Sequence, residues 1–206
     1  DTGPRAMPLL GMVALWAARL SAHITWRHRG QPEDSRYQTI RRNNQPNFEF
    51  KSLYLVFVLQ AVLAWIVSLP LLVGLADPSP LSWADGLGIA LWAFGFAYES
   101  LADWQLAQFK ARPDSPGKVM AEGLWRYSRH PNYFGEFCVW WGFYLLALGN
   151  GGGWAVASPI LMSVLLLRVS GVPMLEKDIL VRRPDYHDYI LRTPAFFPSR
   201  PKSKSP

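Results

Sequence analysis

Apolar residues gather in five long stretches of the chain, and most of the charged residues lie between them. Residues 53–75 form the clearest stretch, because they contain no charged residue and are long enough, as a helix, to cross a bilayer core of about 30 Å. The other four stretches are 8–26, 83–101, 133–148 and 154–175. These four contain polar residues that must face protein or water rather than lipid. The pattern therefore predicts five membrane-spanning helices.

Lysine and arginine residues alternate between the segments that join these stretches. They are frequent in residues 27–51, in residues 103–130 and in the tail from residue 177, but absent from 76–82 and 149–153. Five spans place these two kinds of segment on opposite sides of a membrane. Because cytoplasmic loops are enriched in lysine and arginine, we expect the basic loops and the C-terminus on the cytoplasmic side.

Composition supports an ordered membrane protein. Half of the residues are hydrophobic and 14% are aromatic, which argues against a disordered chain. Cys138 is the only cysteine, so a disulfide scaffold is excluded. We predict an all-α polytopic membrane helix bundle forming a single integral membrane domain over residues 1–206, with residues 199–206 as a flexible cytoplasmic tail.

The net charge of +6 lies on one face of this predicted bundle. It serves either attraction to anionic membrane lipid or the binding of a phosphate-bearing ligand. The sequence has no helix-turn-helix or zinc-finger pattern, so nucleic acid is not an expected partner. His23, His28 and His187 lack metal-ligand spacing, and we predict no metal site.

The densest polar segment is residues 122–136, which lead into the fourth apolar stretch. Pro131 suits the first position of a helix, with His130 as its N-cap residue. The first N–H groups of such a helix lack intrahelical partners, and Arg126 and Arg129 stand just before them. This combination predicts a phosphate site. Binding of lipid headgroups by the same arginines is the alternative.

Glu136 lies about one turn inside the fourth stretch, on the same helix face as Asn132. A carboxylate at that depth is costly unless it is paired, so it is a candidate functional residue. The alternative is a structural ion pair with Arg168 or Arg19 from another span.

Glu99 and Asp103 stand four residues apart at the end of the third stretch. Acidic residues near a helix C-terminus oppose the helix dipole. We therefore expect either a basic partner or a ligand that donates hydrogen bonds. Lys110 and Arg112 follow closely along the chain.

Three segments resemble a known family. Residues 122–148 read EGLWRYSRHPNYFGEFCVWWGFYLLAL, residues 175–178 read LEKD and residues 182–198 read RRPDYHDYILRTPAFFP. With RGQPEDSRYQ at 29–38, they resemble bacterial-type membrane proteins related to the steroid 5α-reductases. The shorter pattern RHPNYxGE is also similar to sterol C14-reductases and isoprenylcysteine carboxyl methyltransferases. Relatives of this kind usually have two further spans upstream.

The resemblance implies a membrane reductase that uses NADPH. Hydride would go to the β-carbon of an enone-like C=C bond in a lipophilic substrate, and a proton would follow at the α-carbon, with Tyr133 or Glu136 as its donor. The positions that match the family's motifs imply these cofactor-binding residues: Arg36, Tyr37, Asp103, Lys110, Arg129, His130, Asn132 and Arg168.

Two other functions stay open. The chain lacks the histidine that the steroid reductases place after the arginine of the last span, here Arg168. One alternative is a methyltransferase using S-adenosylmethionine, whose cationic sulfonium would suit Glu99, Asp103 and Glu136. The other is a non-enzymatic membrane subunit that kept the family fold within a larger membrane complex.

Overall fold

The computed structural model describes residues 3–29, 35–183 and 185–202, and over these residues it contains helices and no strand. The predicted all-α fold is therefore confirmed. The α-helices are α1 (Ala6–His28), α2 (Ser35–Asn43), α3 (Phe48–Ser52), α4 (Leu59–Val67), α5 (Leu69–Ala76), α6 (Trp83–Ala111), α7 (Pro131–Ala147), α8 (Ala157–Val164), α9 (Val172–Arg182) and α10 (Tyr186–Arg192). The π-helical segments are η1 (Leu53–Val58) and η4 (Leu165–Val169), and the 3₁₀ segments are η2 (Gly123–Arg126) and η3 (Gly149–Val156).

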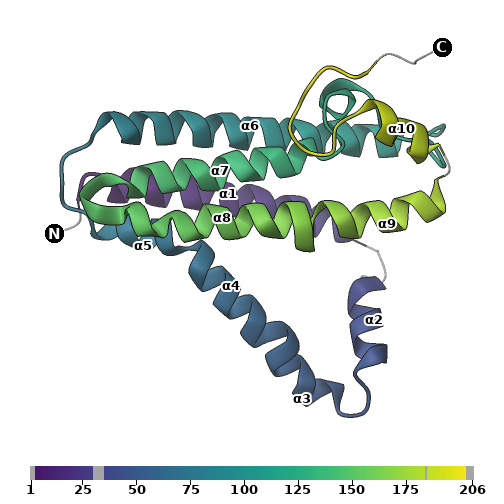
Figure 1. Cartoon of the computed structure of the whole chain (residues 1–206), viewed down its shortest axis with the longest axis horizontal. Helices are drawn as coiled ribbons and strands as arrows, with labels where there is room; N and C mark the ends of the chain where they lie inside the picture. The colour runs from purple at the N-terminus through teal and green to yellow at the C-terminus, as the bar shows by residue number, and fades with distance from the viewer. Residues whose placement is uncertain (1–2, 30–34, 184, 203–206) are drawn as a thin grey trace.

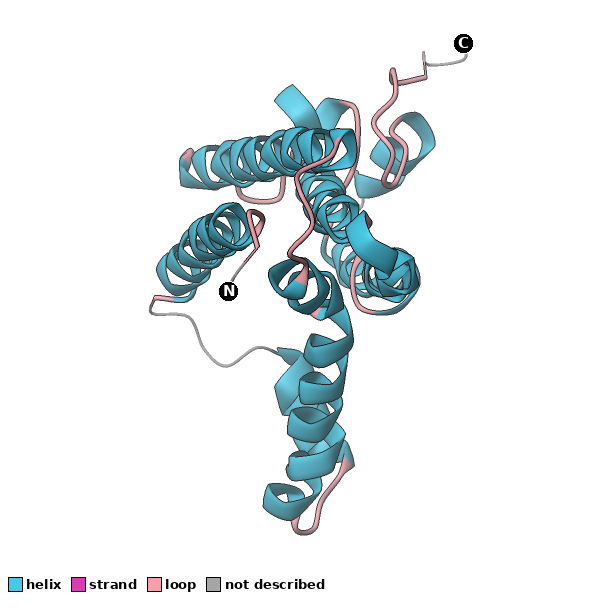
Figure 2. Ribbon diagram, turned by 90° about the vertical axis from the view of Figure 1, so that its left-hand side faces the viewer, coloured by secondary structure: helices cyan, strands magenta, loops and turns pink. Residues whose placement is uncertain are grey.

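The long helices lie side by side, as both views show (Figures 1 and 2). In Figure 1, α1 and α6 run from left to right, α7 returns, and α8 continues into α9 toward the right. The basic segment 103–130 and the tail beyond α9 therefore lie at the same end of the bundle, and the loops 76–82 and 149–153 lie at the other. This arrangement agrees with the alternation of charge. Of the predicted tail 199–206, residues 203–206 lie outside the described part.

Three segments of the described chain are long and apolar enough to cross a membrane: Ala6–Arg27, Phe48–Val67 and Gly151–Glu176. Helices α6 and α7 cover the other two predicted spans and carry the buried acidic and glycine residues described below. The protein is thus an integral membrane protein, and five spans are compatible with its structure.

The second predicted span, 53–75, differs from a single straight helix. The helix that crosses it runs from Phe48 to Val67, and a new helix, α5, begins at Leu69. Pro70 lies in the first turn of α5, where its missing N–H costs no hydrogen bond. The chain turns at this point, so that α2, α3 and α4 project from the bundle while α5 lies against it (Figure 1).

Glycines hold α6 and α7 unusually close together. Gly88 and Gly95 are two helical turns apart on α6, and they face Gly142 and Gly135 of α7. A Cβ atom built on Gly95 would lie 2.6 Å from the carbonyl oxygen of Gly135, and one on Gly142 would lie 2.7 Å from the backbone nitrogen of Trp92. Side chains at these positions would push the backbones apart, as at other close helix crossings in membranes.

An apolar core next to this interface joins α1, α4, α6 and α7. Its buried residues are Leu9, Met12, Val67, Trp92, Val139, Trp140, Phe143 and Leu146. The core packs the N-terminal half of α1 against the bundle. Polar side chains dominate the contacts of the C-terminal half of α1, as described below.

A buried ion pair fixes the start of α1 at the end of the bundle that lacks basic loops. The guanidinium of Arg5, only 1% exposed, donates to both carboxylate oxygens of Asp85, at 2.6 and 2.8 Å. It also lies 3.0 Å from Asp77 Oδ2 and donates to the carbonyl oxygens of Ser79 and Pro80. The positive charge of Arg5 is therefore neutralised within the protein.

The glycine interface predicts opposite effects for two alanine substitutions on α6. Gly95→Ala should lower the free energy of unfolding by roughly 1–3 kcal/mol, because its Cβ would collide with α7. Gly86→Ala, whose Cβ meets nothing within 4 Å, should leave stability unchanged or raise it by up to about 1 kcal/mol through helix propensity. Thermal unfolding of both variants in detergent measures this difference, and equal effects would contradict it.

Removing the guanidinium of Arg5 leaves the buried carboxylates of Asp77 and Asp85 without their basic partner. Arg5→Leu should lower the free energy of unfolding by about 3–5 kcal/mol. The control is Arg112→Leu, which breaks an exposed ion pair with Glu122 and should leave the unfolding midpoint nearly unchanged. A midpoint for Arg5→Leu as high as that of this control would show that the network is dispensable.

Candidate functional site

A group of polar side chains lies between α1, α6 and α7, beyond the apolar core and toward the basic end. We call it the interior polar cluster, and its members are Trp16, Arg19, His23, Glu99, Asp103, Asn132, Glu136 and Trp140. The cluster holds three carboxylates and one guanidinium.

Arg19 of α1 bridges the two acids of α6. Its two terminal nitrogens donate to Glu99 Oε1 and Asp103 Oδ2. Asp103 also accepts a hydrogen bond from Asn132 Nδ2 at 3.2 Å, and His23 Nε2 lies 3.6 Å from Asp103 Oδ2. The basic partner expected for the two acids is therefore Arg19, which comes from a different helix than Lys110 and Arg112.

Glu136 is held by indole groups. Trp16 Nε1 donates to Glu136 Oε2 at 3.1 Å, and Trp140 Nε1 donates to Glu136 Oε1 at 2.8 Å. The two indole rings also meet edge to face, with centroids 5.5 Å apart. Of the two arginines considered as partners of Glu136, Arg19 binds the acids of α6 and Arg168 is exposed on η4.

One oxygen of this cluster has no hydrogen-bond partner. Glu99 Oε2 is buried and unpaired among the described residues, and the Glu99 side chain is only 6% exposed. A buried acceptor without a partner is costly, and most such atoms in proteins are satisfied by water, a proton or a ligand. Glu99 thus marks a position where a hydrogen-bond donor fits.

An open cleft of about 470 Å³ adjoins the cluster at the basic end of the bundle. Its volume is within the range of small-molecule pockets. The polar and aromatic residues of its wall are His23, Trp26, Arg27, Arg29, Asp103 and Lys110. Asp103 and His23 belong to both, so the cleft adjoins the interior polar cluster, with basic side chains in the wall of the cleft and acidic ones in the cluster.

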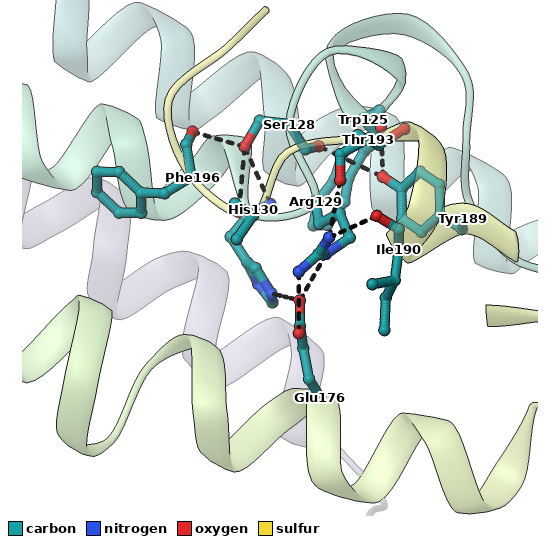
Figure 3. A network of polar contacts seen from close by, with 10 residues as sticks. Trp125, Ser128, Arg129, His130, Glu176, Tyr189, Ile190, Thr193 and Phe196 are labelled. Atoms are coloured by element: carbon teal, nitrogen blue, oxygen red, sulfur yellow. Dashed lines mark hydrogen bonds and ion pairs between the residues drawn. The ribbon is translucent and has the colours of Figure 1, made fainter. Parts of the chain in front are cut away.

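A second polar group, the tail cluster, holds the C-terminal segment against the start of α7 (Figure 3). Arg129 binds both carboxylate oxygens of Glu176 of α9, at 2.7 and 3.1 Å. Its remaining terminal nitrogen donates to the carbonyl oxygens of Thr193 and Ile190, at 2.7 and 3.1 Å. His130 Nε2 lies 3.0 Å from Glu176 Oε1. Arg129 and His130 are thus committed to contacts within the protein.

Tyr189, which lies on α10, is also part of the tail cluster. Its hydroxyl donates to the carbonyl oxygen of Trp125, and the carbonyl oxygen of Ser128 lies 3.3 Å from the same hydroxyl. Burial raises the pKa of Tyr189 well above its usual range, so the phenol keeps its proton at all physiological pH values. Ser128 Oγ in turn donates to the carbonyl oxygen of Phe196 at 2.8 Å. These bonds hold α10 and the C-terminal segment that follows it in place beside residues 125–128.

The predicted start of α7 is confirmed: Pro131 is its first residue and His130 its N-cap residue. The imidazole of His130 does not cap the helix but points to Glu176, and the ring of Tyr133 stacks on it with centroids 5.5 Å apart. Arg126 is exposed beside this helix start. The guanidinium of Arg129, which we predicted as a phosphate ligand, is occupied by carboxylate and carbonyl oxygens.

The structure brings together only part of the predicted site. Asp103, Asn132 and Glu136 meet in the interior polar cluster, and Lys110 lines the adjoining cleft. Arg129, His130 and Tyr133 belong to the tail cluster instead, and Arg168 is exposed elsewhere. Arg36 and Tyr37 are part of α2, but their side chains lie outside the described part of the structure.

Sequence reasoning missed the role of Trp16, and it considered Arg19 only as a partner of Glu136 rather than of Glu99 and Asp103. The signal was present, because Trp16, Arg19 and His23 recur at spacings of three and four and therefore share one face of an apolar helix. Polar residues that line one face of a membrane span mark the side that faces protein.

The tail cluster predicts a protease-sensitive variant. Arg129→Ala leaves Glu176 with His130 but without the guanidinium, and the carbonyl oxygens of Thr193 and Ile190 without this donor, so the C-terminal segment should open more often. Trypsin should then cleave after Arg192 about tenfold faster than in the wild type, measured by mass spectrometry in detergent. Arg126→Ala, which removes a neighbouring exposed arginine, should leave the rate unchanged, and equal rates in all three proteins would refute the role of Arg129.

Comparison with known proteins gives one match. No curated protein and no solved structure is significantly similar to this chain. A family profile, described as "Protein of unknown function (DUF1295)", matches residues 1–193, which include all the residues of the interior polar cluster and most of the tail cluster. The chain therefore belongs to the DUF1295 family.

Proposed function

We propose that this protein is a membrane-embedded reductase that uses NADPH to reduce a C=C bond in a lipophilic substrate, such as a steroid-like enone or an isoprenoid. The observation that carries the proposal is the basic cleft that shares Asp103 and His23 with the interior polar cluster. The resemblance of residues 122–148 to the steroid 5α-reductases supports it independently.

The residues of the cleft fit a dinucleotide phosphate cofactor. Arg27, Arg29 and Lys110 are the side-chain types that bind phosphate groups through charge-assisted hydrogen bonds. Trp26 offers an aromatic face beside them.

The chain's own residues would orient the reactants and exclude water. Arg19 holds Glu99 and Asp103 in fixed positions, and the indoles of Trp16 and Trp140 fix Glu136 between α1 and α7. When bound, NADPH would supply the hydride. A lipophilic acceptor fits a site enclosed by membrane-spanning helices, since it can reach the site from the bilayer.

The charge distribution also supports one orientation of the protein in the membrane. We propose that the end bearing the basic loops and the tail cluster faces the cytoplasm. The mouth of the cleft would then open to the compartment that contains soluble NADPH.

A methyltransferase that uses S-adenosylmethionine is the second candidate, favoured by one observation. The interior polar cluster holds three carboxylates against one guanidinium, an environment that attracts a cationic sulfonium more than a phosphate. The three basic residues at the cleft mouth favour NADPH over this candidate.

Thermal unfolding of the purified protein in detergent separates the two candidates. A ligand that binds the folded state raises the unfolding midpoint in proportion to the logarithm of its concentration. NADPH should raise the midpoint, and S-adenosylmethionine at equal concentration should not. Stabilisation by S-adenosylmethionine alone would favour the methyltransferase, and no response of folded protein to NADPH would contradict the reductase.

Lys110 provides a matched test of the cleft. Lys110→Ala removes a cation from the cleft wall and should weaken NADPH binding about tenfold, which is the loss of one charge-assisted hydrogen bond. Lys118→Ala removes a lysine of an exposed turn, whose ammonium binds Asp114 at 2.6 Å, and should leave binding unchanged. Titration calorimetry measures both dissociation constants, and an equal loss in the two variants would place the cofactor elsewhere.

A further inference from the structure

Glu99 is exceptional among the acids of the interior polar cluster because only one of its two oxygens is bound. Oε1 accepts a hydrogen bond from Arg19, whereas Oε2 is buried with no partner among the described residues. The other two acids have donors at both oxygens. Asp103 binds Arg19 and Asn132, and Glu136 binds two indoles.

The charged groups around Glu99 come from three helices. Arg19 faces it from α1, Asp103, which His23 of α1 approaches, lies one turn further along α6, and Glu136 faces it from α7. Gly135, the neighbour of Glu136, packs directly against the backbone of Glu99, so a Cβ there would lie 2.6 Å from Glu99 N. The carboxylates of Glu99 and Glu136 therefore repel each other across the interface between α6 and α7.

One guanidinium cannot neutralise three carboxylates in a low-dielectric interior. Arg19 divides its two terminal nitrogens between Glu99 and Asp103, and Glu136 receives only neutral indole donors. An uncompensated buried carboxylate costs several kcal/mol, and the cheapest way to remove that charge is to bind a proton. The added hydrogen needs an oxygen that no donor already occupies. Within the cluster only Glu99 Oε2 meets this condition.

We propose that the interior polar cluster is a buried proton-binding site and that Glu99 Oε2 carries the proton in the membrane-embedded protein at neutral pH. The proton neutralises negative charge that Arg19 leaves uncompensated and turns the unpaired acceptor into an O–H donor. Because Asp103 is shared with the cleft, this donor lies beside the region where a ligand would bind.

The proton has a use if the proposed function is correct. Reduction of an enone takes up one hydride at the β-carbon and one proton at the α-carbon. Glu99 would supply that proton: its O–H bond breaks, a C–H bond forms, and Arg19 stabilises the carboxylate that remains. This use rests on the proposed function, whereas the presence of the proton does not. Tyr133 stacks on His130 in the tail cluster, and both oxygens of Glu136 are occupied, so neither matches Glu99 as a donor.

Infrared spectroscopy of the full chain in lipid nanodiscs tests the proposal. A protonated carboxyl group gives a C=O band that is distinct from the bands of carboxylates and amides. The wild type should show this band at pH 7, and Glu99→Gln should lose it. Glu122→Gln, which removes an exposed acid paired with Arg112, is the matched control and should keep it. A wild type without the band, or a Glu99→Gln protein that retains it in full, would overturn the proposal.

A second variant keeps the test decisive if Glu99→Gln fails to fold. Glu136→Gln removes the carboxylate that repels Glu99, so the acid band should disappear at a lower pH than in the wild type when the pH is raised. A band lost at the same pH in both proteins would also overturn the proposal. Failure of the proposed function is a separate result: a protein that shows the band but does not bind NADPH loses the reductase assignment and keeps the proton site.

Discussion

The close contact between α6 and α7 is the constraint on which the site depends. Four glycines let the two backbones meet, and no larger residue fits at Gly95 or Gly135 without moving a helix. Glu99 follows Gly95 by one turn, and Glu136 follows Gly135 directly. The same contact that packs the bundle therefore brings two carboxylates together in its interior. Their proximity is electrostatically unfavourable, and the packing of the helices sustains it.

Helix α1 supplies the groups that bind these carboxylates, and it does so through polar contacts rather than apolar packing. Its first half is fixed by Arg5 and the apolar core, and its second half reaches α6 and α7 through Arg19, His23 and Trp16. The site thus combines a rigid pair of helices with a third helix held by ion pairs and hydrogen bonds, whose polar groups would suit the polar cofactor that we propose.

Features that depend on neighbouring residues could be predicted from the sequence. Pro131 and its preceding residue define the start of α7, and the alternation of basic loops defines the direction of the long helices. Partners distant in the chain could not be predicted. Arg19 binds acids that follow it by 80 or more residues, and Glu176 captures Arg129 from 47 residues away. A single sequence shows that such a charged group requires a partner of opposite charge or a hydrogen bond, but the packing of the helices determines which residue provides it.

A structure of the protein in lipid nanodiscs with NADPH added tests the central claim most directly, namely that cleft and interior polar cluster form one cofactor site. The account predicts density for the phosphate groups beside Lys110 and Arg27, with the nicotinamide ring directed toward Asn132 and Glu99. A cleft filled by lipid at saturating NADPH, or dinucleotide density on another face of the bundle, would contradict it.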